Sequence, residues 1–444
     1  MIAGGLLPRL RRNTELGLMA LVALVTAGAY TLASLGRSSS LPVDLVPFLL
    51  VILGLLAGAH VATRTLAPGA DSLLLPLAGL LNGIGYVFVA RLRPDLAALQ
   101  ALWSALGVLA FVATLATVRR IRDLERFRYS FGLLGIGLLL LPLLPVVGQT
   151  ISGSRLWLKL GPVTFQPGEM AKIALCLFFA SYLVDKRELL SVGTTKIGGL
   201  WVPGIRHIGP ILLAWVFSLV VMFFERDLGS SLLFFALFIS MLWVATARGV
   251  YLGIGGVLFS AGALLAWSVF DHVQRRVQVW VDPWSVADGA GYQIVQALFA
   301  FAAGGMAGTN LAQGSPQRIP AVATDFTFAA IGEELGLLGS VAVIATFVLI
   351  VGSGLRIALR ADAPFEKLLA TGLTAIVGIQ SFIILGGVTR LIPLTGITLP
   401  FVSYGGSSLL ANYVILALLL RISHDQSTRS EAEAVAADAT QLRR

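Results

Sequence analysis

Three carboxylates lie close together in a stretch of the sequence that is otherwise almost entirely apolar. Asp325 opens "DFTFAAIGEELG", and Glu333 and Glu334 follow eight and nine positions later, in a chain with only 23 acidic residues among 444. An acid at a helix N-terminus is a good cap, because the helix dipole favours negative charge there. The same place suits a general base, because partial burial raises the pKa of a carboxyl group toward the working pH. The residues alone leave both interpretations open.

Other charged residues stand at the borders of apolar segments or within them. Glu333 and Glu334 are candidates because carboxylates inside a membrane are costly, although either could pair with a neighbouring Arg or Lys. Glu169 and Lys172, in "QPGEMAK", are three apart and share a helical face. They form either a salt bridge or a site where the lysine holds an anionic head group. Arg276 begins a long loop, where an arginine either reaches to the membrane surface or binds phosphate.

The sequence lacks the motifs of several common classes of enzyme. It has no P-loop and no dinucleotide-binding fingerprint. Four scattered histidines and one cysteine, Cys176, cannot form a zinc site of the usual kinds. We therefore expect no resident metal site. Asp282, in "VDPWS", is first of all a turn former beside proline.

The composition indicates a membrane protein. The chain is 57% hydrophobic and only 12% charged, with a mean hydropathy of +0.88, whereas a soluble domain is about a quarter charged. A helix that crosses a membrane needs about 17 to 25 apolar residues. We assign twelve such segments, at 16–35, 43–63, 72–90, 98–118, 128–148, 168–184, 209–224, 228–246, 250–270, 326–352, 366–389 and 405–422.

The Lys and Arg residues of the short loops predict the orientation of the chain. Three arginines within residues 9–12 precede the first span, and with that end inside, the inner loops collect the cations of 119–126, 186–206 and 356–367. Twelve spans return the C-terminus to the cytoplasm. We expect a multi-pass plasma membrane protein with both termini cytoplasmic. The net charge of +9 then follows from topology and anionic inner-leaflet lipid, and it does not require nucleic acid.

Several segments outside the spans stand out by length or composition. Residues 149–167 and 271–324 face outward, and the second is far longer than a connection needs. Within it, "GYQIVQALFAFAAGG" has the spacing of a short amphipathic helix on the membrane surface or over a cavity. Residues 392–408, "IPLTGITLPFVSYGGSS", predict a broken, re-entrant-like segment that must be shielded by protein or line water. The polar tail, 424–444, is expected to be disordered.

Four motifs, taken in order, resemble those of the SEDS family (shape, elongation, division and sporulation), the RodA/FtsW peptidoglycan polymerases. They are "GSRLWLKLGPVTFQPGEMAK", "ERDLGSSL", the block from "DPWSVADGAGYQIVQALFAFAAGGMAG" to "TDFTFAAIGEELG", and "IPLTGITLPFVSYGGSS". The resemblance covers about residues 72–423 and looks most like the actinobacterial RodA-type branch. It implies an all-α polytopic membrane helix bundle with a ten-span core. Residues 1–71 would then be an N-terminal extension with two further spans, and 424–444 a cytoplasmic tail.

The resemblance implies a peptidoglycan glycosyltransferase for cell elongation and shape, with division as an alternative role. A sugar hydroxyl would attack the anomeric carbon of lipid II on the outer face of the membrane, extending a glycan strand and releasing undecaprenyl diphosphate. The essential aspartate of the T-D-F motif corresponds to Asp325, which favours chemistry over capping. Ala321 and Ala323 stand where the family commonly has Glu and His, so those roles do not carry over. The substrate-binding residues we expect are Arg155, Glu169, Lys172, Arg276, Gln293, Glu333 and Ser403.

Two other functions compete with this one. A lipid II flippase needs polar residues through the full depth of the membrane, whereas the charged residues here gather at the outer ends of the spans. A scaffold that only recruits a transpeptidase needs no carboxylate in a cavity. The resemblance also implies a class B penicillin-binding protein as partner, besides lipid II, nascent glycan and membrane lipid. It implies no firm cofactor, only a divalent cation, Mg or Mn, that could accompany the lipid diphosphate.

Overall fold

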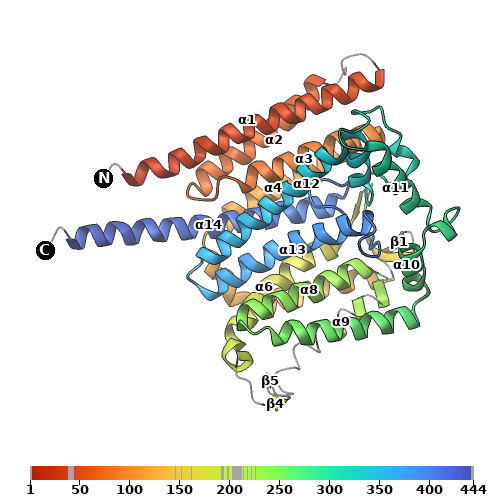
Figure 1. The fold of residues 1–444 in the computed structure, drawn as a ribbon. Coiled ribbons are helices and arrows are strands. Elements are labelled where there is room, and N and C mark those ends of the chain that lie inside the picture. Colours follow the sequence, from red (N-terminus) through yellow and green to blue (C-terminus); the bar gives the residue numbers. More distant parts are fainter. Residues whose placement is uncertain are drawn as a thin grey trace.

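Long α-helices dominate the fold, with short 3-10 turns and two small sheets between them (Figure 1). The computed structural model describes residues 3–38, 45–145, 147–151, 153–161, 163–191, 195–197, 200–202, 213, 215–217, 219–221, 223–225 and 227–441. The helices are α1 (Ala3–Ser38), α2 (Leu45–Leu66), α3 (Leu74–Leu92), α4 (Pro94–Thr117), α5 (Arg128–Leu140), α6 (Pro167–Ser191), α8 (Leu228–Thr246), α9 (Val250–Val269), α10 (Asp271–Val281), α11 (Tyr292–Gly304), α12 (Thr327–Arg360), α13 (Pro364–Val388) and α14 (Gly406–Gln441). The 3-10 turns are η1 (Ile121–Phe127), η2 (Leu141–Leu143), η3 (Trp284–Val286) and η4 (Pro316–Arg318).

The expected membrane helix bundle is confirmed. Among the described residues, ten helical segments are long and apolar enough to cross a membrane. They include all the predicted spans except two. The predicted span 43–63 corresponds to α2, an apolar helix that is not among the ten. Most of the predicted span 209–224 lies outside the described residues.

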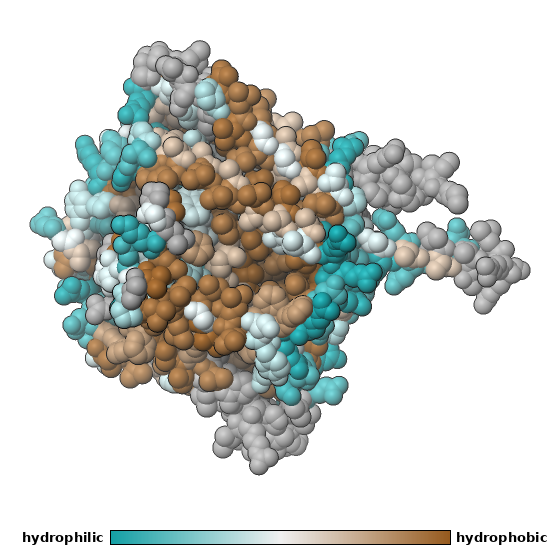
Figure 2. Space-filling model, turned by 180° about the vertical axis from the view of Figure 1, so that it is seen from behind, coloured by the Kyte–Doolittle hydropathy of each residue, from teal (hydrophilic) through white to brown (hydrophobic). Residues whose placement is uncertain are grey.

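The bundle has two distinct ends. The start of α1 and the far end of α14 lie at one end, whereas α10, α11 and β1 lie at the other, which we call the loop end (Figure 1). Seen from behind, a hydrophobic band crosses the middle of the molecule between hydrophilic margins (Figure 2). Leu133 on α5 and Leu264 on α9 are exposed. Such a band is expected where lipid, rather than water, surrounds the helices.

Local sequence signals set the ends of the helices. At the start of α8, the Asp227 side chain accepts a hydrogen bond from the backbone N–H of Ser230, and at its end Ala247 adopts a left-handed conformation. Inside α12, Gly336 has a φ of +66°, which breaks the helix after its first turns. A Cβ atom at Gly336 would lie 2.3 Å from the backbone nitrogen of Gly308. The break therefore lets residues 271–324, which we call the outward loop, pack directly against the first turns of α12.

Two regions differ from the sequence-based expectations. The outward segment 149–167 forms a three-stranded antiparallel sheet of β1 (Gly148–Ile151), β2 (Ser154–Leu160) and β3 (Val163–Phe165), and a hairpin of β4 (Thr195–Ile197) and β5 (Leu200–Val202) lies elsewhere. The alternating sequence "SRLWLKL" explains β2. The tail that we expected to be disordered continues as α14 as far as Gln441. It contains neither Gly nor Pro, so nothing in it ends the helix.

The loop end is ordered by two helices and by the 392–408 segment. The amphipathic helix predicted within 271–324 is confirmed as α11, which packs on α12 through buried side chains such as Ile294 and Ala297. The sequence did not predict α10, which forms about the first fifth of the loop. Residues 392–408 are irregular as far as α14, and most of their side chains are buried, as expected for a re-entrant-like segment inside protein.

Candidate functional site

Asp325 lies at the entrance to α12 but does not cap it. The helix begins at Thr327, and its N-cap residue, Phe326, makes no side-chain cap hydrogen bond. The backbone N–H groups of Thr324 and Asp325 both donate to the carbonyl oxygen of Ala321, at 3.1 Å each. The backbone thus forms the turn, and the geometry does not support the capping interpretation of the carboxylate.

Arg276, on α10, faces Asp325 across Gly396. Its Nη1 donates to the carbonyl oxygen of Leu394 at 2.8 Å, so the 392–408 segment holds the guanidinium in place. A Cβ atom built on Gly396 would lie 3.7 Å from Arg276 Nη2 and 3.8 Å from Asp325 Oδ2. Gly396 has a φ of +78°, which L side chains rarely adopt. Glycine therefore allows the turn and leaves the space between the two charged groups open.

A polar cavity of about 220 Å³ lies beside these two groups. It brings α10, α11 and the 392–408 segment together around Asp325. Its lining residues are Arg275, Arg276, Val279, Trp280, Ala290, Gln293, Ile294, Asp325, Gly387, Arg390, Ile392, Leu394 and Gly396. The cavity therefore offers a ligand one carboxylate, three arginines and the amide of Gln293, which the sequence had predicted as a substrate-binding residue.

The charges around the cavity shift one another's titration. Burial raises the pKa of Asp325 to about 6; Thr324 and Arg276 lower it, and Asp227 raises it further. Burial also lowers the pKa of Arg276, and the two aspartates oppose this shift. A carboxyl group with a pKa near 6 is ionised at neutral pH yet is basic enough to accept a proton. Shifted groups that share a cavity are typical of functional sites.

Asp227 is a candidate residue that the sequence analysis did not include in the site. Its carboxylate accepts hydrogen bonds from the Ser230 backbone N–H at 3.0 Å and from the Ser230 hydroxyl. It is buried, burial raises its pKa, and its charge acts on both Arg276 and Asp325. The motif "ERDLG" was the available signal. Only the fold shows that this motif lies beside α10.

Glu169 and Lys172 form a buried salt bridge next to this cluster. Lys172 Nζ lies 2.6 Å from Glu169 Oε2 and donates to Gln380 Oε1 at 2.6 Å. Gln380 in turn donates to the carbonyl oxygen of Thr398 at 2.9 Å. The lysine is only 2% exposed. The geometry therefore supports the salt-bridge interpretation, in which the pair joins α6 and α13 to the 392–408 segment.

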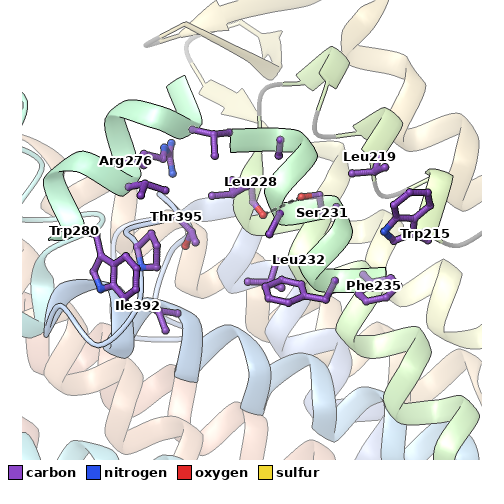
Figure 3. A pocket seen from close by; sticks show the side chains of 17 residues that line it. Trp215, Leu219, Leu228, Ser231, Leu232, Phe235, Arg276, Trp280, Ile392 and Thr395 are labelled. Carbon is purple, nitrogen blue, oxygen red and sulfur yellow. Dashed lines mark hydrogen bonds between the residues drawn. The ribbon is translucent and has the colours of Figure 1, made fainter. Parts of the chain in front are cut away.

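An apolar cavity of about 430 Å³ opens between α8, α9 and α10 (Figure 3). Arg276, Trp280 and Thr395 lie at one end of it, and Trp215 and Phe235 lie toward the other (Figure 3). The remaining lining residues include Leu219, Leu228, Ser231, Leu232, Phe259, Gly262, Ala263, Ala266, Val273, Val277, Ile392 and Pro393. Arg276, Trp280 and Ile392 line the polar cavity as well, so the two cavities are neighbours.

Arg390 is a further cavity residue that the sequence analysis missed. Its Nε and Nη2 donate to the carbonyl oxygens of Trp280 and Val281, at 2.7 and 2.6 Å. The Trp280 indole donates back to the carbonyl oxygen of Arg390 at 3.2 Å. This reciprocal contact fastens the end of α10 to the end of α13. Arg390 lies two residues before the motif "IPLTGITLPFVSYGGSS", but no pattern around it marks the arginine as different from others near the membrane.

Arg155, which we expected to bind substrate, makes other contacts. Its guanidinium donates to the carbonyl oxygens of Pro142 and Leu144, at 3.1 and 3.2 Å. These contacts tie β2 to η2. Arg155 is not among the described residues that line either cavity, so the structure gives it a place in the sheet rather than beside Asp325.

Glu333 and Ser403 also have local partners. Glu333 Oε1 accepts the backbone N–H of Ser315 at 2.6 Å, which ties the outward loop to α12. The Ser403 hydroxyl accepts the backbone N–H of Leu399 at 3.2 Å, inside the 392–408 segment. Neither belongs to the described lining of the polar cavity. Both residues therefore act on the site indirectly. Glu333 holds the outward loop, and Ser403 stabilises the 392–408 segment that contacts Arg276.

The described residues form no metal centre of their own. Within the described ranges, no group of three or more His, Cys, Asp or Glu side chains could hold a metal ion. The positive charge at the polar cavity comes from its three arginines instead. The donor set at Asp325 therefore does not fit a resident divalent cation.

The fold and the site define a multi-pass membrane protein with a charged cavity at the loop end and an apolar cavity next to it. A family model of the FtsW, RodA and SpoVE proteins, described as "Cell cycle protein", matches residues 91–428. The chain belongs to this family.

Curated relatives and solved structures agree with this assignment. The "Peptidoglycan glycosyltransferase RodA" of Mycobacterium tuberculosis is 45% identical over 425 residues, covering 93% of this chain and 91% of that protein. The protein of the same name from Mycobacterium leprae is 45% identical over 424 residues, covering 93% and 90%. One chain of a peptidoglycan synthase complex is 28% identical, with a TM-score of 0.66, covering 80% of this chain and 98% of that chain. Thermus thermophilus RodA is 26% identical, with a TM-score of 0.57, covering 80% and 97%.

Proposed function

We propose that this chain is a peptidoglycan glycosyltransferase that polymerises lipid II, and that Asp325 accepts the proton of the attacking hydroxyl. The observation that carries the proposal is the position of Asp325 and Arg276, which face each other across Gly396 beside a polar cavity. The mycobacterial relatives named above support the class of reaction, because their 45% identity extends over 93% of this chain.

The two neighbouring cavities match the chemistry of a lipid-linked sugar diphosphate. The apolar cavity takes part of the lipid chain, Arg276 at the shared wall binds the diphosphate, and the polar cavity takes the sugar. Hydrogen bonds between a guanidinium and phosphate are strong where water is excluded. The Thr395 hydroxyl supports this arrangement, because it is buried at the Arg276 end and has no hydrogen-bond partner among the described residues.

The reaction is a displacement at the anomeric carbon of the sugar that bears the diphosphate. The oxygen of an acceptor hydroxyl forms the new glycosidic bond while its proton passes to Asp325. The bond from the anomeric carbon to the diphosphate oxygen breaks, and the electron pair leaves with undecaprenyl diphosphate. Arg276 stabilises the charge that develops on this leaving group. Asp325 can accept the proton because burial raises its pKa to about 6.

A flippase is the second candidate, and the positions of the charges argue against it. A flippase moves the head group through the whole membrane, which requires polar residues along the path. The charges described here meet at the loop end, and the adjoining apolar cavity carries only Arg276 as a charged lining residue among those described. A scaffold would leave the shifted pKa of Asp325 and the open space at Gly396 without a function.

The arrangement of the bundle supports an outward-facing site with both termini in the cytoplasm. The start of α1 and the far end of α14 lie at the end opposite α10 and α11 (Figure 1). The arginine-rich loop before η1 lies there too, because the Ile121 backbone N–H donates to Asp425 of α14 at 3.1 Å. Positively charged loops remain on the cytoplasmic side. The loop end, with Asp325, is then extracytoplasmic.

A transpeptidase and a divalent cation complete the proposal. The structural neighbour described above belongs to a complex that coordinates polymerization and crosslinking. For this chain we propose a class B penicillin-binding protein as the equivalent partner. We further propose that Mg or Mn, where the reaction uses it, enters on the lipid diphosphate rather than on the protein.

The test is the polymerisation of lipid II by the purified chain in detergent or nanodiscs, with Asp325→Asn as the inactive control. Glycan strands from the unaltered chain and none from Asp325→Asn support the proposal. Transfer of labelled lipid II across a vesicle membrane without polymer would instead support the flippase. Polymer of normal length from Asp325→Asn would overturn the assignment of the base.

A further inference from the structure

The first helix, α1, packs closely against α3. Glycines on α3 allow this close contact, because a Cβ atom at Gly83 would lie 2.2 Å from Thr26 Oγ1. Near the other end of α1, the buried Glu15 lies 2.8 Å from Nδ1 of His60 on α2. Small residues at such contacts let membrane helices approach closely. The N-terminal pair is therefore packed into the bundle rather than loosely attached to it.

The last turn of α1 reaches the outward loop. A Cβ atom at Gly36 would lie 2.2 Å from the carbonyl oxygen of Leu311 and 3.4 Å from the Cβ of Ala312. The atom that it would meet first belongs to the backbone, so no side chain can rotate away to make room. Only glycine at position 36 allows the loop to rest against the helix as it does.

The part of the loop that touches α1 is fixed to α12. Its backbone N–H groups donate to Glu333 and Glu334: Ser315 to Glu333 Oε1 at 2.6 Å, and Ala312 to Glu334 Oε2 at 3.0 Å. Arg91, at the end of α3, lies 2.7 Å from Glu334 Oε1 and donates to the Gly314 carbonyl oxygen at 3.2 Å. Glu333 and Glu334 therefore bind the part of the loop that leads into Asp325.

The same loop continues directly to Asp325. After η4 it reaches Ala321, whose carbonyl oxygen accepts the N–H groups of the turn at 324–326. Ala312 and Ala321 both have a positive φ, of 64° and 56°. Non-glycine residues hold such a backbone only where the surroundings determine it. The contacts of α1, Arg91 and the two glutamates are therefore among those that keep this loop in its observed path.

We propose that α1 positions residues 309–326, the part of the loop that leads into Asp325. The N-terminal extension would then affect catalysis by fixing the position of the Asp325 carboxylate. The expected change in kcat rests on the function proposed above. The contact between α1 and the loop does not depend on that function. It assigns a role to the N-terminal pair of helices that precedes the family match at 91–428. Gly36 and Arg91 are positioning residues in this view, since neither touches the polar cavity in the described structure.

The experiment compares two glycines on the same helix. Gly36→Ala places a methyl group against the Leu311 carbonyl, whereas Gly28→Ala places one where no atom lies within 4 Å. We expect Gly36→Ala to lower kcat about 10-fold with KM nearly unchanged, because a small displacement of a catalytic group is costly. Gly36→Leu should lower it further. The Gly28 variant should retain the kcat of the unaltered full-length protein.

Backbone hydrogen exchange of the full-length protein, measured without substrate, provides the second readout. We expect faster exchange at 309–326 in the Gly36 variants and unchanged exchange in α6, α13 and the Gly28 variant. Equal kcat and equal exchange in the Gly36 and Gly28 variants would overturn the proposal. So would a general increase in exchange throughout the bundle in Gly36→Ala, which would mean that α1 only supports the fold. If no variant, including the unaltered chain, polymerises lipid II, the proposed function fails while the exchange data still decide the loop contact.

Discussion

Arg276 and Asp325 face each other across a glycine: a methyl group on Gly396 would lie 3.7 Å from Arg276 Nη2 and 3.8 Å from Asp325 Oδ2. A guanidinium that touches a leaving phosphate and a carboxylate that touches an attacking hydroxyl would need such a gap between them. The gap depends on backbone geometry, because Gly396 has a positive φ and Leu394 anchors Arg276.

Replacing Asp325 by Asn should abolish polymerisation with little change in folding. The substitution keeps the size of the side chain and removes its ability to accept a proton, and general-base catalysis contributes about 10²–10⁴-fold to rate. Asp282→Asn is the matched control, because Asp282 accepts the Ser285 backbone N–H at 3.3 Å in an exposed turn. Gel analysis of labelled lipid II products measures both variants. Loss of polymer in Asp282→Asn with normal polymer in Asp325→Asn would transfer the role of base to Asp282.

The rate should depend on pH through the ionisation of Asp325. Burial raises its pKa to about 6, so a base at this position would be protonated and inactive below that pH. We expect kcat/KM to fall about tenfold per pH unit below pH about 6 and to level off above it. Initial rates between pH 4.5 and 8, at constant ionic strength, measure this, with circular dichroism to verify that the fold persists. A flat profile over that range would contradict a base with a raised pKa.

Two substitutions should move the acidic limb of the pH profile, where kcat/KM falls as Asp325 is protonated, in opposite directions. Arg276 lowers the pKa of Asp325 and Asp227 raises it. Arg276→Gln should therefore move the limb to higher pH, whereas Asp227→Asn should move it to lower pH. The position of the limb is independent of how much activity each variant retains, so the comparison separates electrostatics from substrate binding. Movement of both limbs in the same direction would show that the two residues do not act through the charge of Asp325.

The sequence predicted the parts of the molecule that depend on local pattern. Apolar length predicts spans such as α8, and the spacing of "GYQIVQALFAFAAGG" predicts α11, because both signals lie within a single helix. The T-D-F motif marks Asp325, two positions before α12 begins, as the catalytic carboxylate, and this role stays a prediction. The small sheet at 148–165 was missed, because three short strands stabilise one another only in pairs and none is distinctive alone.

The connections between distant segments could not be predicted. Arg155 and Glu333 are charged residues in characteristic motifs, and the structure places both against backbone groups and outside the described lining of the polar cavity. Asp227 precedes α8 and Arg390 follows α13, and only the fold brings both beside α10 and the polar cavity. A charge pattern identifies groups that need a partner. It does not show whether the partner is a ligand or the protein itself.

Lys172 should act chiefly through stability. It is 2% exposed and lies 2.6 Å from Glu169 Oε2, so Lys172→Met leaves a buried carboxylate without its cation. Breaking a buried pair in this way costs about 3–5 kcal/mol, whereas removing both charges costs much less. Thermal unfolding should therefore show a large loss in Lys172→Met and a partial recovery in Glu169→Gln/Lys172→Met. A variant of unchanged stability that binds lipid II weakly would instead return Lys172 to the substrate-binding set.

A large side chain placed in the apolar cavity should weaken the binding of long lipid chains. Ala263 lines the cavity on α9, whereas Ala261 on the same helix is exposed and does not line it. Ala263→Trp should raise KM for long-chain lipid II about 10-fold with kcat nearly unchanged, because it removes binding that is equal in the ground and transition states. A short-chain analogue should be less affected. Ala261→Trp is the control, and an equal rise in KM in both variants would place the lipid chain elsewhere.

A class B penicillin-binding protein should bind this chain and raise its turnover. The chain belongs to the FtsW/RodA/SpoVE family, and one structural relative is a member of a peptidoglycan synthase complex. A partner that binds two states of the outward loop unequally shifts their populations, and only a few kcal/mol are needed. Co-purification from detergent, with polymerisation measured alone and together, tests this. The control is a transpeptidase whose transmembrane helix is replaced by an unrelated one, which should neither co-purify nor stimulate. Full activity of the chain alone, unchanged by the partner, would exclude activation while leaving the chemistry at Asp325 intact.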